Sequence, residues 1–196
     1  MERGDALEAL YRLREAEAAK TLEMNTATSN MAAYLRHTLA EYANSRSVML
    51  AALGWNEDAL AAARASRLLE ASIPESHYNF GMLQLQQAAG LARGAVRDRM
   101  LEEARSAFEQ ARTLDPAFRE AVVMEGVSRI MAGDCSRGTE RIRAGWAIDP
   151  ATPRLYPMET GPGDQNSAGL HRRRRIEIVP PELDPAARLA SCDGRA

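Results

Sequence analysis

Apolar residues recur at intervals of three and four positions along most of the first 150 residues. This spacing places them on one side of an α-helix. Polar and turn-forming residues interrupt the pattern repeatedly, so we expect about seven helices joined by short connections. The expected helices cover residues 2–24, 31–53, 57–71, 77–91, 101–114, 117–131 and 135–148.

The residues between these segments are typical of helix ends. Several can accept a hydrogen bond from the first turn of a helix and are expected as N-caps. The candidates are Ser29 or Asn30, Asn56, Asp115, Asp134 and Asp149. Pro116 and Pro150 would occupy the first helical position, where a missing N–H costs nothing. Gly54 is expected to end the second helix and Pro74 the third, and the charged residues 97–99 indicate a loosened connection.

The second half of the chain repeats itself at an interval of 34 residues, the separation of Asp115-Pro116 from Asp149-Pro150. At this shift small residues align with small ones and large with large. The aligned pairs are Ala104 with Gly138, Phe108 with Ile142, Ala111 with Gly145, and Leu114 with Ile148. The match predicts the same contacts in both segments, with small residues where two helices approach closely.

A helix–turn–helix unit of 34 residues is the period of the tetratricopeptide repeat. Ala104, Phe108, Ala111 and Pro116 match the second-helix signature of that family, and Gly126 stands where its first helix commonly has a small residue. Residues 77–150 therefore resemble two such repeats, 77–116 and 117–150. The first would carry an insertion of about eight residues, because Pro74 precedes Pro116 by 42 positions.

The resemblance implies an all-α solenoid of antiparallel helix pairs over residues 1–150. Residues 31–76 would be a degenerate repeat, in which Pro74 and Ala62 match the pattern while Ser66 and Leu69 depart from it. Residues 1–30 would supply an extra helix. A different α-helical bundle is the alternative, because an alanine-rich chain can imitate this periodicity.

Residues 151–196 form a different kind of segment, which contains six of the nine prolines. Prolines prevent another repeat, so we expect an extended and partly ordered arm. Leu155, Tyr156 and Met158 are expected to pack on the last helix, near Ile142 and Trp146. Within the arm, residues 175–179 alternate like a short strand, and residues 185–189 could form one or two helical turns.

Composition agrees with a helical fold and offers little chemistry. Alanine supplies 36 of the 196 residues, aromatic residues only 5%, and the net charge is −2. The arginines are scattered among a slightly larger number of acidic residues, so no specific nucleic-acid partner is expected. The two cysteines are too few for a disulfide-stapled small fold. Cys135 is expected to be a buried or half-buried cysteine and not a reactive nucleophile, and Cys192 a free thiol near the terminus.

No pattern of catalytic or metal-binding residues stands out. Three histidines and two cysteines are spread over more than 150 residues, and the chain has no phosphate-binding loop or nucleophile motif. We therefore expect no catalytic residue, cofactor or metal, and no enzymatic activity. An enzyme with an unrecognised site is a remote alternative.

In the tetratricopeptide family the first helices of the repeats line a concave groove that holds peptides or helices. The resemblance places six apolar residues at such positions: Tyr78, Met82, Leu85, Val123, Val127 and Ile130. It therefore implies a protein-interaction scaffold, or a structural subunit of a larger assembly. The expected occupant of the groove is an apolar helix or peptide of another protein, or the chain's own tail, and a homo-oligomer is a further option.

Two other hypotheses concern the surroundings of the protein. Domains that resemble this one are frequent in bacterial systems for polysaccharide assembly and secretion at the cell envelope, which is the alternative function. Arg172, Arg173, Arg174 and Arg175 form the only dense charge run and could dock an anionic partner.

We expect the protein to be located in the cytoplasm, or in the periplasm if an export signal was removed. We expect it to contact a membrane only through a partner.

Overall fold

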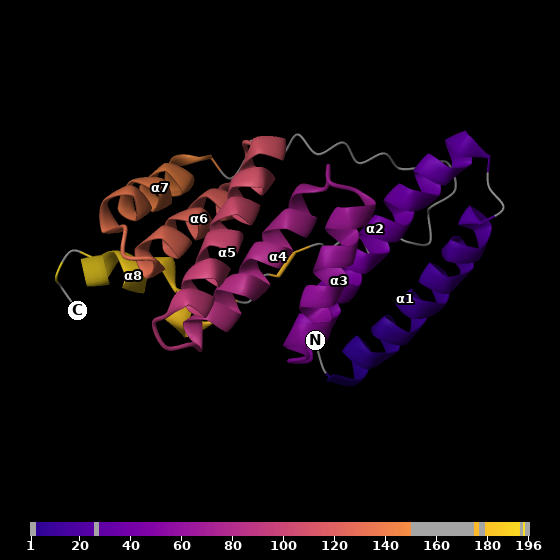
Figure 1. Cartoon of the computed structure of the whole chain (residues 1–196), viewed down its shortest axis with the longest axis horizontal. Coiled ribbons are helices and arrows are strands. Elements are labelled where there is room, and N and C mark those ends of the chain that lie inside the picture. Colours follow the sequence, from indigo (N-terminus) through magenta and orange to yellow (C-terminus); the bar gives the residue numbers. More distant parts are fainter. Residues whose placement is uncertain (1–2, 26–27, 150–174, 177–178, 193, 195–196) are drawn as a thin grey trace. The chain divides into compact units, whose positions relative to one another are not determined.

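The computed structural model describes residues 3–25, 28–149, 175–176, 179–192 and 194, which contain helices and no strand (Figure 1). This confirms the all-α prediction. The helices are α1 (Arg3–Met24), α2 (Ser29–Ala52), α3 (Asn56–Leu69), α4 (Pro74–Ala89), α5 (Ala95–Leu114), α6 (Arg119–Met131), α7 (Cys135–Ala147), the 3-10 helix η1 (Pro181–Leu183) and α8 (Pro185–Cys192). The first seven correspond to the predicted helices, and η1 and α8 lie in the arm.

Packing divides the chain into two compact units within α4, between Asn79 and Phe80. Unit 1 contains α1 to α3, the first part of α4 and residues 175–176. Unit 2 contains the rest of α4, α5 to α7, η1 and α8. The sequence placed residues 1–150 in one repeat domain and the arm outside it. In the structure the arm instead contributes residues to both units.

In unit 1, α2 packs against both α1 and α3. The buried face of α3 consists largely of alanines, which allow the helix to approach α2 closely. Ser66 lies on this face and donates a hydrogen bond to the carbonyl oxygen of Ala40 at 2.7 Å. Its hydroxyl is also 2.6 Å from that of Ser76. The departure of Ser66 from the repeat pattern therefore has a physical role, because its polar atom links α3 to two neighbouring helices.

In unit 2, α6 packs against α5, α7 and α8, and residues 121–128 of α6 are all buried. The contact with α7 is very close. A Cβ atom on Gly126 would lie 2.6 Å from Cγ1 of Ile142, and one on Gly138 would lie 2.5 Å from Cγ1 of Ile130. The predicted use of small residues at close helix contacts is confirmed here.

The corresponding contact between α4 and α5 joins Gly81 to the ring of Phe108, which a Cβ atom would approach to 2.8 Å. Gly81 precedes Phe108 by 27 positions, whereas Gly126 precedes Ile142 by 16. The spacing between the two residues in contact is therefore 11 positions longer in the α4–α5 pair than in the α6–α7 pair. The extra residues lengthen α4, the loop that follows it and the start of α5.

The structure differs from the prediction at the starts of two helices, α4 and α5. Residues 97–99 belong to α5 and not to a loosened connection, because α5 begins at Ala95 directly after Gly94. Arg97 has a structural role there: its Nη2 donates to the carbonyl oxygen of Met131 at 3.0 Å. Pro74, expected to end the third helix, is the first residue of α4, a position that proline favours.

The predicted helix caps were correct in part. Asp134 caps α7 by accepting a hydrogen bond from the backbone N–H of Arg137 at 3.2 Å. Asp115 instead accepts from the N–H of Ala117 in a turn, and α6 begins only at Arg119. Ser29 and Asn56 are first residues of their helices and do not cap them. Short polar residues fit both roles, so the sequence alone did not separate them.

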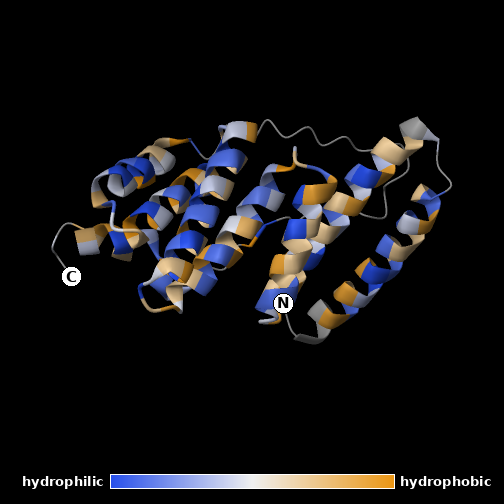
Figure 2. Cartoon of the chain, viewed as in Figure 1, coloured by the Kyte–Doolittle hydropathy of each residue, from blue (hydrophilic) through white to orange (hydrophobic). Residues whose placement is uncertain are grey.

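Hydrophilic and hydrophobic residues alternate around each helix (Figure 2). Among the described residues, no helix combines the length and apolar character that crossing a bilayer requires.

Candidate functional site

The end of the arm folds onto unit 2, where α8 packs against α6 and α7 (Figure 1). Leu183 in η1 is its anchor, with 0% of its surface exposed. The helical turns expected at residues 185–189 are confirmed, and the helix continues to Cys192. A segment that was expected to be largely extended therefore ends in a docked helix.

One face of α8 is partly covered and the other is open. The partly covered side chains are Pro185, Arg188, Leu189, Ala190 and Cys192, whereas Ala187 and others are exposed. Four of these five, all but Ala190, have the spacing i, i+3, i+4 and i+7, which places them on one side of a helix. This is the pattern by which an amphipathic helix lies on a complementary protein surface.

Local hydrogen bonds hold the start of α8 in place. The carboxylate of Asp184 accepts from the backbone N–H of Ala186 at 3.1 Å. Nε of Arg188 donates to the carbonyl oxygen of Glu182 at 2.9 Å. Because both contacts lie within residues 182–188, the segment carries its own helix-start signal and does not depend on α6 or α7 for it.

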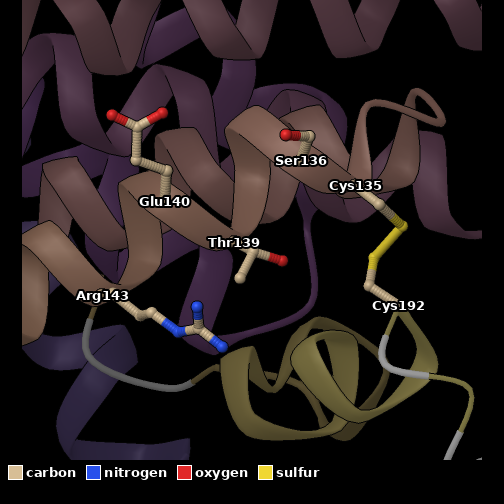
Figure 3. Close-up of a pocket in the computed structure, with 6 residues that line it drawn as sticks. All are labelled: Cys135, Ser136, Thr139, Glu140, Arg143 and Cys192. Carbon is tan, nitrogen blue, oxygen red and sulfur yellow. A yellow bond between two sulfur atoms is a disulfide. The ribbon is translucent and has the colours of Figure 1, made fainter.

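A disulfide joins Cys135, the first residue of α7, to Cys192, the last residue of α8 (Figure 3). Their Cα atoms are 5.6 Å apart, although 57 positions separate them in sequence. The expectation of a free thiol at Cys192 was wrong. The physical reason is the return of the arm to α7, which no pattern around either cysteine encoded; an even number of cysteines was the only available signal.

A cavity of about 460 Å³ lies between α7 and α8 beside the disulfide. Its other lining residues are Ser136, Thr139, Glu140 and Arg143 of α7, and Arg143 extends toward α8 (Figure 3). The lining contains hydroxyl, carboxylate and guanidinium groups with no histidine and no free thiol. It offers hydrogen bonds to a polar group but no nucleophile paired with a base.

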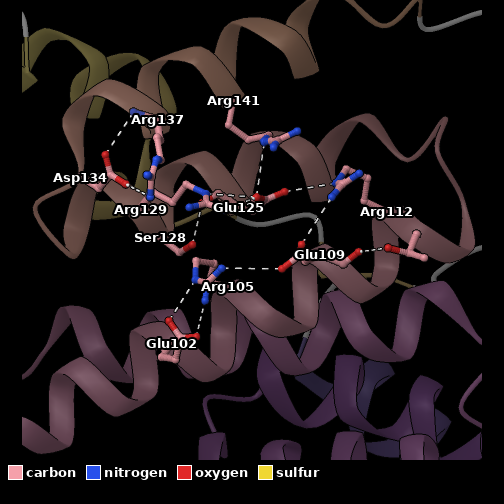
Figure 4. Close-up of polar contacts among 11 residues, drawn as sticks. Glu102, Arg105, Glu109, Arg112, Glu125, Ser128, Arg129, Asp134, Arg137 and Arg141 are labelled. Carbon is pink, nitrogen blue, oxygen red and sulfur yellow. Dashed lines mark hydrogen bonds and ion pairs between the residues drawn. The ribbon is translucent and has the colours of Figure 1, made fainter.

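A buried carboxylate holds α5, α6 and α7 together on another side of the unit (Figure 4). Glu125 of α6 has 0% side-chain exposure and is surrounded by three guanidinium groups. Its oxygens are 3.3 Å from Nε of Arg112, 2.9 Å from Nη2 of Arg129 and 3.4 Å from Nε of Arg141. Each arginine comes from a different helix, so Glu125 links all three.

The charges around this cluster balance one another. A cavity of about 430 Å³ beside it is lined by three arginines and three carboxylates, which are Arg105, Arg129, Arg137, Asp98, Glu102 and Asp134. Arg105 forms an ion pair with Glu102, and its hydrogen bond lowers the pKa of that carboxyl. Arg137 pairs with Asp134 at 3.7 Å. Both pairs are i,i+3 contacts along one segment of the chain, and the formal charges of the six ionisable residues that line the cavity sum to zero.

The six residues predicted to line a groove are Tyr78, Met82, Leu85, Val123, Val127 and Ile130, and all six are buried. Val123 and Ile130 face α7, where they lie against Gly145 and Gly138. Tyr78 belongs to unit 1 and the other five to unit 2. These side chains form the interior of the units and present no open surface.

Several other predicted features lie outside the described residues. They include Leu155, Tyr156 and Met158, and three of the four clustered arginines, Arg172, Arg173 and Arg174. Arg175 is half-buried, and the neighbouring N–H of Ile176 donates to Oδ1 of Asn79 at 2.8 Å. Among the described side chains, no group of three or more His, Cys, Asp or Glu is arranged to hold a metal ion.

Comparison of the chain with protein-family models, curated proteins and solved structures gave no match. The packing of α8 on α6 and α7 is therefore the structural feature from which we infer a function.

Proposed function

We propose that this chain is a non-enzymatic protein-interaction module of the tetratricopeptide type, in which α6 and α7 form a docking site for a short amphipathic helix. The observation that carries the proposal is α8 itself. It lies on both helices with partly covered residues at i, i+3, i+4 and i+7. The site is defined by what α8 contacts, and no longer by the six buried residues that the sequence suggested.

The same observation indicates which partner would fit. Leu183 is fully buried and Leu189 faces the body of the unit, so the ligand is a helix with two leucine anchors and few charges on its inner face. The chain's own segment competes for the site at a high effective concentration, because it is covalently attached. A partner helix would therefore bind only when α8 is released.

A peptide-binding experiment tests this proposal. A chain that ends at residue 179 lacks η1 and α8 and keeps α6 and α7. We expect a fluorescent peptide of residues 180–192 to bind this chain, measured by anisotropy, and to bind the oxidised full chain far more weakly. A peptide with Leu183→Asp should fail to bind. One with Ala187→Asp is the matched control, because Ala187 is exposed on α8.

A folded 1–179 chain that does not bind the peptide would contradict the proposal. If truncation unfolds the chain, as circular dichroism would show, the full-length Cys192→Ser variant replaces it, because it lacks the disulfide that fixes α8 on α7. The peptide should then bind this variant more tightly than the oxidised full chain, and equal binding would contradict the proposal.

The disulfide favours a second candidate function, a soluble domain of a bacterial cell-envelope system. Disulfides persist in oxidising compartments such as the periplasm and are rare in the cytoplasm. A Cys135–Cys192 bond therefore supports a location outside the cytoplasm. Quenching cells of the native host with an alkylating reagent would measure this. Oxidised cysteines in a periplasmic fraction would support the second candidate, and alkylated cysteines in a cytoplasmic fraction would contradict it.

A further inference from the structure

One face of α1 packs against α2. Leu10 and Leu13 are buried on this face. On the same side, Glu17 forms an ion pair with Arg46 of α2. Burial raises the pKa of Glu17, and the charge of Arg46 opposes that rise. Because two leucines and an ion pair already hold α1 to α2, the remaining faces of α1 are not needed for its attachment.

A second face of α1 is apolar and open to solvent. Leu7, Tyr11 and Leu22 are 43%, 64% and 70% exposed, and Ala18 is also exposed. At 100° per residue, these four side chains fall within about 60° around the helix axis. Leu7 and Leu22 are 15 positions apart, which is about 22 Å along the helix. We call these four residues the α1 stripe.

The α1 stripe is symmetric about a point between Arg14 and Glu15. Leu7 and Leu22 are equally far from this point, and so are Tyr11 and Ala18. Arg14 and Glu15 flank the stripe at its centre, and Arg14 is close enough to Glu17 for its charge to lower the pKa of that carboxyl. A hydrogen bond with Glu15 raises the pKa of Tyr11, which places that carboxylate on the same side of α1 as the tyrosine.

We propose that the α1 stripe is a self-association surface, on which α1 of a second copy of this chain packs antiparallel about a two-fold axis at its centre. In that arrangement Leu7 of one copy lies opposite Leu22 of the other. The large ring of Tyr11 lies opposite the small Ala18. The centre gathers two arginines and two glutamates, and each Arg14 comes within reach of the Glu15 of the other copy.

A second copy fits this surface better than an unrelated protein because a two-fold interface must be complementary to itself. Three features of the α1 stripe meet that requirement. Its residues are spaced symmetrically, the large Tyr11 faces the small Ala18, and the charges of Arg14 and Glu15 cancel at the centre. Binding of an unrelated protein would not require this symmetry. The contact uses one helix from each copy, below about 1,200 Å² in total, so the dimer is reversible and depends on concentration.

The test is a charge-swap series in the full chain, read by sedimentation equilibrium. Arg14→Glu or Glu15→Arg places four like charges at the centre of the pair. Each single variant should raise the dimer dissociation constant about five- to thirtyfold. The double variant R14E/E15R restores two charges of each sign and should return the constant to within about threefold of the starting value. Arg12→Glu lies outside the stripe and should have little effect.

An apolar variant tests the rest of the stripe. Tyr11→Asp should abolish dimerisation while circular dichroism shows unchanged helix content, because Tyr11 does not contact the core. A chain that stays monomeric up to about 1 mM would overturn the proposal and leave the stripe to another occupant. Dimerisation that resists Tyr11→Asp, or that the double variant does not restore, would place the interface elsewhere and overturn it as well.

Discussion

Gly145 of α7 lies directly against Val123 of α6: a Cβ atom on the glycine would sit 2.6 Å from Cγ2 of Val123 and 3.0 Å from its backbone nitrogen. The second distance matters most, because a backbone atom cannot move aside as the end of a side chain can. The absence of a side chain at position 145 therefore sets how closely α6 and α7 approach.

Replacing Gly145 by alanine should force the two helices apart. We expect a loss of about 1–3 kcal/mol in the free energy of unfolding, measured by urea denaturation. Gly90→Ala is the matched control, because its nearest neighbour is an ordinary 3.7 Å away, and its effect should stay within about 0.5 kcal/mol. If Gly145→Ala and Gly90→Ala have the same free energy of unfolding, Gly145 and Val123 are not in close contact.

The Glu125→Gln variant should destabilise unit 2. It removes the negative charge that three arginines share and leaves their positive charges close together. Loss of one partner of a buried ion pair costs about 3–5 kcal/mol. The arginines here are partly exposed and can turn toward water, so we expect about 2 kcal/mol.

The control for this variant is Glu109→Gln. Glu109 is 48% exposed and pairs with Arg105 at 3.7 Å and with Arg112 at 3.8 Å. Its loss should cost less than about 1 kcal/mol in the same denaturation experiment. If Glu109→Gln is as destabilising as Glu125→Gln, burial does not distinguish the two carboxylates.

His77 should make unit 1 less stable in mild acid. Burial lowers the pKa of its imidazole below the ordinary value of 6.5, and the charge of Arg67 lowers it further. Nδ1 accepts from Nε of Arg67 at 3.2 Å and Nε2 is 2.8 Å from the carbonyl oxygen of Ala71, an arrangement that suits the neutral ring. Well above pH 6.5 the imidazole of His77 is neutral in both the folded and the unfolded chain. As the pH falls, the imidazole of the unfolded chain is protonated first, because its pKa is higher.

The stability that His77 contributes is therefore complete above pH 6.5 and is lost as the pH falls through its lowered pKa. The free energy of unfolding should fall as the pH drops below about 6.5, and fall less in the His77→Gln variant. The matched control is His37→Gln, which replaces a second imidazole of unit 1, one that is 35% exposed beside Glu41 of α2. An unchanged decline in the His77 variant would contradict this assignment.

Reduction of the Cys135–Cys192 bond should destabilise the docked tail. The bond closes a loop across a sequence separation of 57 residues, and loops of this length contribute about 2–4 kcal/mol. We expect that loss on adding a thiol reductant, together with faster hydrogen exchange in residues 181–192. Cys192→Ser should match the reduced protein and show no further change with reductant. A reductant effect that persists in this variant would have another origin.

The sequence by itself determined the helices and the closest contacts between them. Apolar residues at intervals of three and four positions mark a helix with one buried side, and this pattern can be read from each segment by itself. All seven predicted helices are therefore present in the structure. The 34-residue shift located Gly138 and Gly145 as contact residues, because a helix can approach a neighbour closely only where side chains are small. Buried Ile142 and Phe108 follow from the same shift.

Only the tertiary structure decided which apolar surfaces stay open and where the arm goes. The six groove candidates are apolar and correctly spaced, but spacing does not show whether another element covers them, and all are buried. Cys135 and Cys192 form a bond across 57 residues through a return of the chain that no local pattern encodes. Long-range closure depends on the packing of the whole unit, and for that reason the docking site on α6 and α7 could not be predicted from the sequence.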